Sequence, residues 1–502
     1  MGFSCSIAAA ILAGSTAFIH AKPTSFSGCD GVCRDLHQEF PNQVLLRNET
    51  AYALEQTSFW STVQGSASPT CFFTPASANE VSRAVDIARD GQCQFAAKSG
   101  GHYSFEASTI DNGLVVDLAR MNETVVSDDK RSAVVGPGGR WSSVYPILQE
   151  QNLTIPGGRM FGVGVGGLTL GGGISWLSNI HGMTCDNVQD YEAVLANGSI
   201  VTASPTSHPD LYWALRGGGS NFGIVTKFTF DAYEQGKLWT AQLEYDGAAN
   251  ASSITAFVNW GDQLVATDPK SFSVLLWDYN KDALPTGTAT LTHADTFTNS
   301  KHPAVFDGFY SAGPNNITET NAYHAEIADG LVFPGGVTRN SFWTTSFVLD
   351  AGIMQMAFEV WREEAKAIES IATQQLQLQI FTRAQFEFAK RNGGNPTSFA
   401  EQERPLGFLN IIAMRKNAED DKIVYATQQR VEERVNAVAR ERGLYNGFKY
   451  TNYASQFQDP FTSYGAENKA RLLKIAKEYD PEGVFQKLVS GGFKLTHGPE
   501  YV

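Results

Sequence analysis

The spacing of hydrophobic and polar positions changes once along the chain. Between residues 71 and 230, short apolar runs alternate with helix-like stretches. Apolar side chains recur at helical spacing over 78–90, just before Gly91, whereas 113–119 and 132–138 have the pattern of short strands. Residues 189–204 hold two strand-like segments around Asn197-Gly198, which predicts a hairpin. This mixture predicts an α+β domain.

Beyond Gly236 the alternating segments become longer and rich in Thr, Phe and Val, as in 271–280 and 288–298. Helices are predicted over 352–372 and over 421–442, the second closed by Gly443, with a strand over 406–416 between them. This pattern predicts a second α+β domain, a sheet backed by helices. Two domains also fit a chain of 502 residues.

The first 21 residues have the pattern of a signal peptide. An apolar stretch runs from Ile7 to Ile19 and small residues precede a cleavage point near Ala21, although no Lys or Arg precedes Ile7. A buried first helix is the alternative interpretation, but Lys22 and the polar run after it favour cleavage. We therefore expect secretion. No later apolar run is long enough to span a bilayer.

The remaining cysteines favour the same compartment. Cys29, Cys33, Cys71 and Cys93 have no CxxC or HxxxH partner that would complete a zinc site, so we expect two disulfides and no metal. Their spacing leaves all three connectivities open. Cys185 is the odd, buried thiol. Six N-x-S/T sequons fit a glycosylated exported protein, at Asn48, Asn122, Asn152, Asn197, Asn250 and Asn316.

Charge restricts the class of partner. The net charge is -14 and no run of Lys or Arg occurs, which argues against nucleic acid and against an anionic membrane surface. We expect a small-molecule ligand and a monomer.

The densest glycine tract, residues 156–176, is the main candidate for ligand binding. Gly162, Gly164 and Gly167 match G-x-G-x-x-G, the dinucleotide fingerprint. Pro156 precedes the match and Gly171 begins a run of three glycines after it, so we expect no regular helix to start here. We predict instead an irregular wall whose bare N–H groups face a large flat or anionic ligand.

Five ordered motifs now identify a family resemblance: KSGGHYSF, VVGPGGRWSSVYPIL, VGVGGLTLGGGISWLSNIHGMTCDNV, DLYWALRGGGSNFGIVTKF, and YTNY with YDPEGVF. The chain resembles the berberine-bridge-enzyme-like flavoproteins of the vanillyl-alcohol oxidase superfamily. The resemblance implies a bipartite FAD-binding domain, residues 22–235 and 445–502, around a substrate domain at 236–444. The middle of the chain contains none of these motifs and resembles the family only in its general residue pattern.

In this family the histidine after Ser-Gly-Gly is bonded to the 8α carbon of FAD, so the resemblance implies covalent FAD at His102. An imidazole nitrogen is a competent nucleophile for that bond. Further cofactor contacts are implied at Ser99, Gly100, Gly101, Tyr103, Ser104, Pro137, Gly162, Val163, Gly166, Gly167, Gly172, Ile224, Tyr450 and Asn452.

Two further features follow from the resemblance. Doubly attached relatives have a cysteine where this chain has Met160, so we expect a single attachment. The same analogy pairs Cys29 and Cys33 each with one of Cys71 and Cys93.

The resemblance implies Tyr453 as the candidate base, because the last tyrosine of YTNY can act as a base beside the flavin in this family. On a strand, Tyr450 and Asn452 face one side and Thr451 and Tyr453 the other. A free tyrosine titrates near pH 10, so a base here needs a neighbouring cation that the sequence does not identify. The strand around Asn410 lacks the carboxylate that some relatives use there, and Asn410 is its polar side chain.

We predict a secreted oxidase that transfers hydride from an alcohol or secondary-metabolite substrate to FAD and then to oxygen, releasing hydrogen peroxide. Val163 occupies the position that gates oxygen in the family. A carbohydrate oxidase with the same cofactor is the alternative. A flavin-binding protein without turnover is a third hypothesis, from another class.

Overall fold

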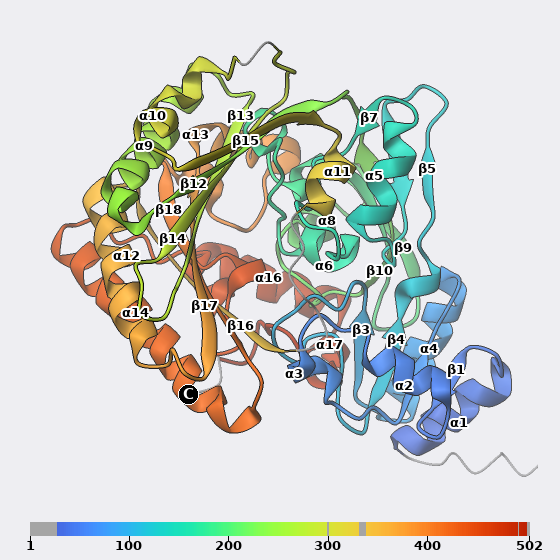
Figure 1. Ribbon diagram of the computed structural model, residues 1–502. Helices are drawn as coiled ribbons and strands as arrows, with labels where there is room; N and C mark the ends of the chain where they lie inside the picture. Colours follow the sequence, from blue (N-terminus) through green and yellow to red (C-terminus); the bar gives the residue numbers. More distant parts are fainter. Residues whose placement is uncertain (1–27, 299–300, 331–337, 490, 499–502) are drawn as a thin grey trace, which may run out of the picture.

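The computed structural model describes residues 28–298, 301–330, 338–489 and 491–498. The predicted signal peptide at 1–21 lies outside the described residues. Figure 1 shows two halves side by side, with helices on the outer face of a large sheet in one half and two smaller sheets in the other.

The first half contains two main sheets. One has the order β1-β2-β4-β3, in which β2, β4 and β3 run parallel. The other has the order β5-β6-β10-β8-β9 and is antiparallel. Their bounds are β1 Val44–Leu46, β2 Cys71–Phe73, β3 Phe95–Lys98, β4 Leu114–Asp117, β5 Thr124–Val126, β6 Ser132–Val135, β8 Val188–Val194, β9 Ile200–Ala203 and β10 Ile224–Asp231.

A two-stranded ladder and eight α-helices complete the described residues of this half. They are β7 Leu153–Thr154 with β11 Tyr233–Glu234, and α1 Cys29–Glu39, α2 Thr50–Gln56, α3 Thr62–Gly65, α4 Ala78–Asp90, α5 Trp141–Gln149, α6 Val165–Leu170, α7 Ser178–His181 and α8 Pro209–Leu215. The predicted hairpin is confirmed, with β8 paired to β9 and Gly198 at φ 80° in its turn.

The second half is built on a seven-stranded antiparallel sheet of order β15-β12-β14-β13-β17-β18-β16. Its strands are β12 Leu238–Tyr245, β13 Ser271–Asp278, β14 Thr286–His293, β15 Asn316–Ala322, β16 Arg339–Val348, β17 Ala372–Phe381 and β18 Leu406–Arg415. Its helices are α9 Asn250–Asp262, α10 Asp307–Ser311, α11 His324–Asp329, α12 Ala351–Lys366, α13 Arg383–Phe388 and α14 Asp421–Glu441.

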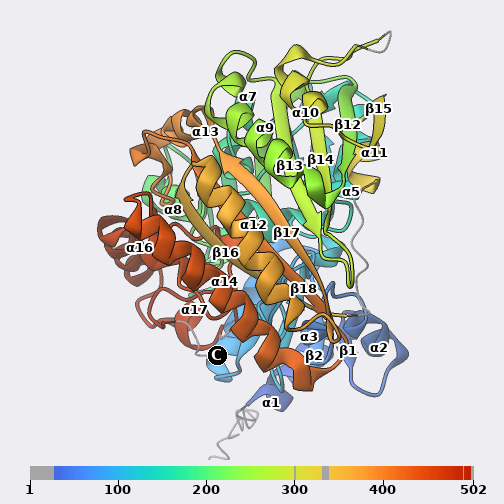
Figure 2. The same ribbon diagram turned by 60° about the vertical axis from the view of Figure 1, so that its left-hand side comes forward.

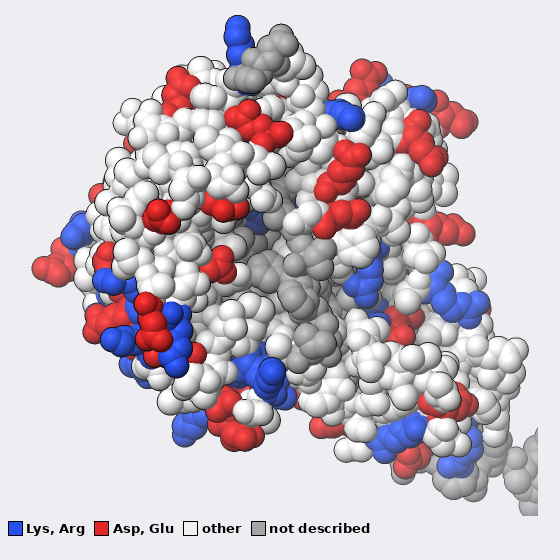
Figure 3. All heavy atoms as spheres, viewed as in Figure 1, with Lys and Arg blue, Asp and Glu red and all other residues white. Residues whose placement is uncertain are grey.

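Helices α9, α12 and α14 cover one face of this sheet (Figure 2), which confirms the predicted sheet backed by helices. Trp277 and Leu376 of the sheet pack with Phe358 and Trp361 of α12 in a shared core. On the face seen in Figure 3, acidic and basic side chains gather together over α12 and α14, where Arg430 pairs with Glu364. The sheet's other face is left to form the wall of a cavity.

The C-terminal segment returns to the first half through α15 Pro460–Ser463, α16 Ala466–Tyr479 and α17 Val484–Lys487. Leu472 of α16 packs in the same core as Tyr212 of α8, and Phe485 of α17 packs against Phe95 of β3. The domain boundaries themselves stay a prediction.

One predicted helix is too long. The pattern indicated a helix over 352–372, but α12 ends at Lys366 and β17 begins at Ala372. Buried Ile368 and half-buried Ile371 continue the apolar spacing past Lys366, so the spacing alone does not show where the helix ends. The Gln374 side chain donates to the carbonyl of Ala365 at 2.7 Å and so satisfies a C-terminal acceptor of α12.

The two predicted disulfides and the buried free thiol are confirmed. Disulfides join Cys29 to Cys93 and Cys33 to Cys71, and Cys185 is free and buried. Across the described ranges no helix is long and apolar enough to cross a membrane. Within the same residues no group of His, Cys, Asp and Glu side chains is placed to hold a metal ion.

Candidate functional site

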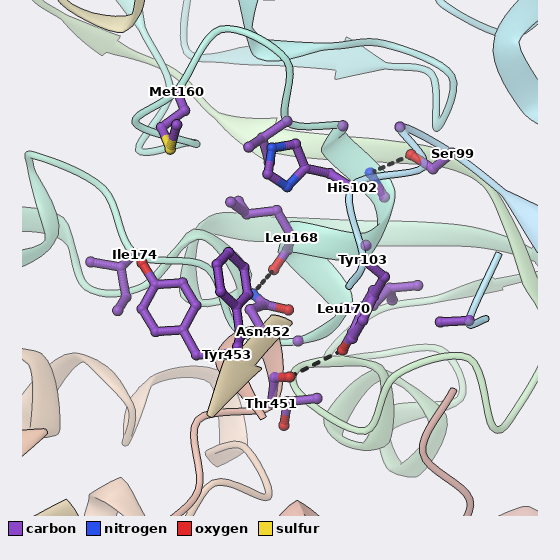
Figure 4. A pocket seen from close by; sticks show the side chains of 18 of the residues that line it. Ser99, His102, Tyr103, Met160, Leu168, Leu170, Ile174, Thr451, Asn452 and Tyr453 are labelled. Carbon is purple, nitrogen blue, oxygen red and sulfur yellow. Dashed lines mark hydrogen bonds between the residues drawn. The ribbon is translucent and has the colours of Figure 1, made fainter. Parts of the chain in front are cut away.

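A cavity of about 530 Å³ lies between the glycine-rich loops of the first half and the uncovered face of the seven-stranded sheet. It is of the size that small-molecule and cofactor sites have. Figure 4 shows His102 and Met160 on one side of this space, and Thr451, Asn452 and Tyr453 on another. Gln377 of β17 and Asn410 of β18 also line the cavity, so segments from both halves of the molecule face it.

The loop after β3 carries His102 into the cavity wall. Gly101 has φ 64°, and a Cβ on Gly100 would lie 2.5 Å from the Cα of Gly164, so the two glycines are needed for the turn and for the close approach. The His102 ring stacks on Trp60 with centroids 4.4 Å apart and planes at 10°. Burial, together with the positive charge of Arg140, lowers the pKa of His102 to about 4. The imidazole is therefore neutral, and available as a nucleophile, at neutral pH.

The wall beside His102 is glycine-rich backbone. Ser99 Oγ donates to the carbonyl of Pro137 and accepts from the N–H of Gly166 at 3.1 Å (Figure 4), which joins the His102 loop to the glycine tract. A Cβ added to Gly167 would meet no atom within 4 Å, so this residue presents bare backbone to the cavity. A neutral imidazole and bare N–H groups around one cavity fit FAD, a large flat ligand with an anionic diphosphate.

The prediction that no regular helix starts in this tract is wrong in part. Helix α6 begins at Val165, directly after Gly164, on which a Cβ would lie 2.4 Å from the backbone nitrogen of Gly100, and lasts six residues. It ends at Gly171, where Gly172 and Gly173 have φ of 108° and 84°. The six helical residues lie between Gly164, which packs closely against Gly100, and the Gly171–Gly173 run, which packs closely against Asn452, Met183 and Thr184.

Most of the predicted cofactor residues line the cavity. They are Ser99, Gly100, Gly101, His102, Tyr103, Pro137, Val163, Gly166, Gly167, Ile224, Tyr450 and Asn452. Ser104, Gly162 and Gly172 are not among its lining residues. Gly162 instead offers its carbonyl to the Arg140 side chain, and a Cβ on Gly172 would meet Met183 at 2.6 Å.

The YTNY segment is not a strand. Thr451–Tyr453 form a 3-10 turn in which the N–H of Tyr453 bonds to the carbonyl of Tyr450 at 2.9 Å. The predicted division of its side chains between two faces is wrong, because Tyr450, Thr451, Asn452 and Tyr453 all line the cavity. Asn452 Nδ2 donates to the Leu168 carbonyl and to Tyr450 Oη, each at 3.0 Å, which holds the turn against α6 (Figure 4).

Tyr453 has the cationic neighbour that a base at this position needs. Arg159 Nη2 donates to Tyr453 Oη at 2.8 Å and to Gln379 Oε1 at 2.9 Å, while Gln379 Nε2 lies 3.2 Å from the same tyrosine oxygen. Arg159 is only 9% exposed. A guanidinium at this distance in a buried setting stabilises negative charge on the tyrosine oxygen.

By contrast, the neighbouring Tyr450 hydroxyl is not suited to accept a proton. Burial, and then the nearby Tyr453, raise its pKa. Tyr103 is similarly held in its neutral form, because burial raises its pKa, and its hydroxyl donates to the Thr451 carbonyl at 3.0 Å (Figure 4).

Asn410 lines the cavity from β18, as a site residue would. Its Nδ2 lies 3.5 Å from Gln377 Oε1, and Gln377 in turn accepts from Gln379 Nε2 at 2.7 Å. The amides of β17 and β18 therefore connect Asn410 to the Tyr453 and Arg159 pair. Its role in catalysis stays a prediction.

The sequence patterns did not identify Arg159, Gln377 or Gln379. A signal for the glutamines was present, since Gln and Leu alternate over 375–378 and strand geometry sends alternate residues to opposite faces. Leu376 and Leu378 pack in the helix-covered core, and Gln375 and Gln377 line the cavity. For Arg159 no local signal existed, because it lies among glycines and its partner is 294 residues away.

Comparison with known proteins agrees with this geometry. Residues 69–204 match the family model described as FAD binding domain. The FAD-dependent monooxygenase tpcD of Cochliobolus heterostrophus is 34% identical over 456 residues, 87% of each chain.

Solved structures show the same fold. The wild-type BBE-like 1 protein of Physcomitrella patens superposes with a TM-score of 0.75 at 21% identity, over 93% of this chain and 99% of that one. The xylooligosaccharide oxidase of Myceliophthora thermophila has a TM-score of 0.72 at 22% identity, over 94% and 100%. The FAD-binding match, the near full-length relative and the shared two-domain architecture lead to one conclusion: this chain belongs to the berberine-bridge-enzyme-like FAD-linked oxidoreductases of the vanillyl-alcohol oxidase superfamily.

Proposed function

We propose that this chain is a secreted oxidase that binds FAD covalently through His102 and oxidises the CH–OH group of a small alcohol or secondary metabolite. The observation that carries the proposal is the cavity itself, because His102, the bare glycine wall and the Tyr453–Arg159 pair all face it. When bound, FAD supplies the acceptor for the substrate hydride and passes the two electrons to oxygen, giving hydrogen peroxide.

The chain's own residues handle the proton. The substrate hydroxyl proton passes to the Tyr453 oxygen as the hydride leaves the adjoining carbon, and a carbonyl product forms. Arg159 donates a hydrogen bond to this tyrosine oxygen at 2.8 Å and holds it at the cavity wall. Gln379 fixes the tyrosine in this position from the sheet side.

The orientation and the protonation state of His102 support the proposed covalent attachment. The stacked Trp60 ring fixes the plane of the imidazole, and its lowered pKa keeps the ring unprotonated. Met160 lines the cavity and has no thiol to form a second bond, so one attachment is proposed. Val163 lines the same cavity and is the proposed oxygen gate.

Two other activities have support of their own. The relative tpcD is named a monooxygenase, and such an enzyme would place one atom of oxygen in the product. A carbohydrate oxidase is favoured by the polar side chains that the sheet presents to the cavity, among them Gln242, Thr288 and Thr290, and by the fold shared with xylooligosaccharide oxidase. A flavin-binding protein without turnover is the remaining candidate.

Secretion is proposed from the predicted signal peptide and the two disulfides, which persist in oxidising compartments. Asn48, Asn122, Asn152 and Asn197 are exposed, as glycosylation at these sequons requires. Expression with the native leader, followed by mass spectrometry of the medium, tests both points.

The cofactor is tested by denaturing gel electrophoresis with flavin fluorescence. The wild-type band should fluoresce and the band of His102→Ala should not, while both should bind FAD before denaturation. Oxygen uptake and peroxide release are then measured on alcohols, phenols, monosaccharides and cello-oligosaccharides. Peroxide equal to substrate consumed supports the oxidase, whereas oxygen-18 in the product supports the monooxygenase and absence of turnover supports the third candidate.

A further inference from the structure

Residues 60–65, which include α3, lie where the two halves of the molecule meet (Figure 1). On one side, the N–H of Trp60 donates to the carbonyl of Gly101 at 3.1 Å. On the other side, Asn340 of β16 donates its backbone N–H to Ser61 Oγ at 3.0 Å and its Nδ2 to the carbonyl of Trp60 at 3.1 Å. Asn340 is fully buried. This segment therefore connects the seven-stranded sheet to the loop after β3.

Gln64 of α3 holds that loop on both sides of the histidine. Its Nε2 donates to the carbonyl of Gly101 at 3.2 Å and to that of Tyr103 at 2.8 Å, the residues directly before and after His102. Its Oε1 accepts from the N–H of Ser108 at 3.2 Å and from Ser108 Oγ at 2.6 Å. Gln64 is fully buried, and these hydrogen bonds use both ends of its amide.

The loop after β3 needs support from outside because it has no secondary structure of its own. Residues 99–110 form no helix or strand, and Gly101 has φ 64°, a conformation that glycine adopts freely. The ring of His102 is held from the same segment, since it stacks on Trp60 with centroids 4.4 Å apart. Residues 60–65 thus fix both the backbone of the loop and the plane of the imidazole.

Attachment of the flavin depends on this geometry. The N–C bond to the 8α carbon forms while one C–H bond of that methyl group and the N–H bond of the imidazole break. Two electrons and two protons go to the flavin, and oxygen then removes them as hydrogen peroxide. A misplacement of about 1 Å in a reactive geometry costs on the order of 100-fold in rate. A neutral imidazole therefore reacts only if its loop is held in place.

We propose that Gln64 and Asn340 are positioning residues for the covalent attachment of FAD, so that the bond to His102 forms only when the seven-stranded sheet has packed against the first half and holds residues 60–65. Neither residue lines the cavity, so both act through the contacts of that segment. This inference rests on the proposed function for the attachment itself, and it adds which residues control it.

The rate of attachment, measured apart from FAD binding, tests the inference. Full-length protein produced under riboflavin limitation is incubated with FAD in air, and attached flavin is followed by fluorescence of the denatured band and by intact mass. Gln64→Leu should lower the maximal rate about 100-fold, because the loop loses its support. The FAD concentration that gives half of the maximal rate should change by less than about threefold, because the cofactor contacts remain. Asn340→Leu should lower the maximal rate about tenfold, since it acts through Trp60 and Ser61.

Gln56→Leu and Asn436→Leu are the matched controls. Gln56 lies just before the segment and donates to the Ala67 carbonyl at 2.8 Å instead of to the loop. Asn436 is a buried asparagine of the second half that accepts from Thr345 Oγ1 at 2.7 Å. Both controls should attach FAD at the wild-type rate. Thermal melting of each flavin-free variant separates a slower attachment from a loss of fold.

A wild-type attachment rate in Gln64→Leu, or an equal loss of rate in the variants and their controls, would overturn the inference. A wild-type rate in Asn340→Leu would overturn the part assigned to the sheet. If Gln64→Leu does not fold, Asn340→Leu decides, because it keeps Gln64. The failures are distinguishable: a wild-type band without flavin refutes the attachment and this inference with it, whereas attachment that depends on Gln64 without peroxide from any substrate refutes only the oxidase.

Discussion

Replacing Tyr453 by Phe removes one oxygen atom from the centre of the site and keeps the ring. In the wild type this oxygen accepts from Arg159 Nη2 at 2.8 Å and from Gln379 Nε2 at 3.2 Å, and it is the proposed proton acceptor. Positioned general bases contribute about 100- to 10,000-fold to rate. The variant should therefore lose kcat by that factor, which corresponds to about 3 to 5 kcal/mol in the barrier.

Tyr450→Phe is the matched control. Its hydroxyl lies in the same turn and accepts from Asn452 at 3.0 Å, but burial raises its pKa and keeps the proton on it. We expect kcat to fall by no more than about tenfold, the cost of one lost hydrogen bond near the site. Both variants should retain covalent flavin on a denaturing gel.

Steady-state kinetics on the best substrate of the panel, with peroxide as readout, measure both variants. Single-turnover reduction of the bound flavin under nitrogen then separates proton and hydride transfer from reoxidation. The proposed role for Tyr453 is refuted if Tyr453→Phe keeps more than a tenth of the reduction rate, or if the two variants lose rate equally.

Three other predictions concern stability and cofactor loading. Burial lowers the pKa of His324 to about 3, whereas an unfolded histidine titrates near 6.5. The unfolded chain therefore takes up this proton first, and acidification from pH 7 to pH 5 should cost about 2 kcal/mol of unfolding free energy from this residue. Urea titrations should show a shallower loss in His324→Phe. Gly167→Val should lower the ratio of flavin to protein absorbance without lowering the melting temperature of the flavin-free protein, since a Cβ here meets no protein atom and Gly167 lines the cavity; unchanged flavin content would contradict the fit to FAD. Removing the bond between Cys33 and Cys71, which are 38 residues apart, should cost about 4 kcal/mol, and Cys185→Ala should cost far less.

Local patterns along the chain determined much of the site. The Ser-Gly-Gly-His loop, the glycine tract and the YTNY segment each lie on the cavity wall. In the first two, glycine marks the places where the backbone approaches closely. The same logic failed where a local pattern was ambiguous. YTNY has the residues of a strand, yet Asn452 bonds to Leu168 and stabilises a turn.

By itself the sequence determined the α+β class, the sheet backed by helices, the membership of a flavoprotein family and the loop that carries His102. Only the tertiary structure decided which charged side chain lies beside the candidate base. It brought Arg159 of the glycine tract to Tyr453 and Gln379, and it stacked Trp60 on His102. The physical reason is that hydrophobic spacing and glycine content reflect each residue's own backbone and burial, whereas a hydrogen bond between residues 294 apart exists only once both halves have packed around the cavity.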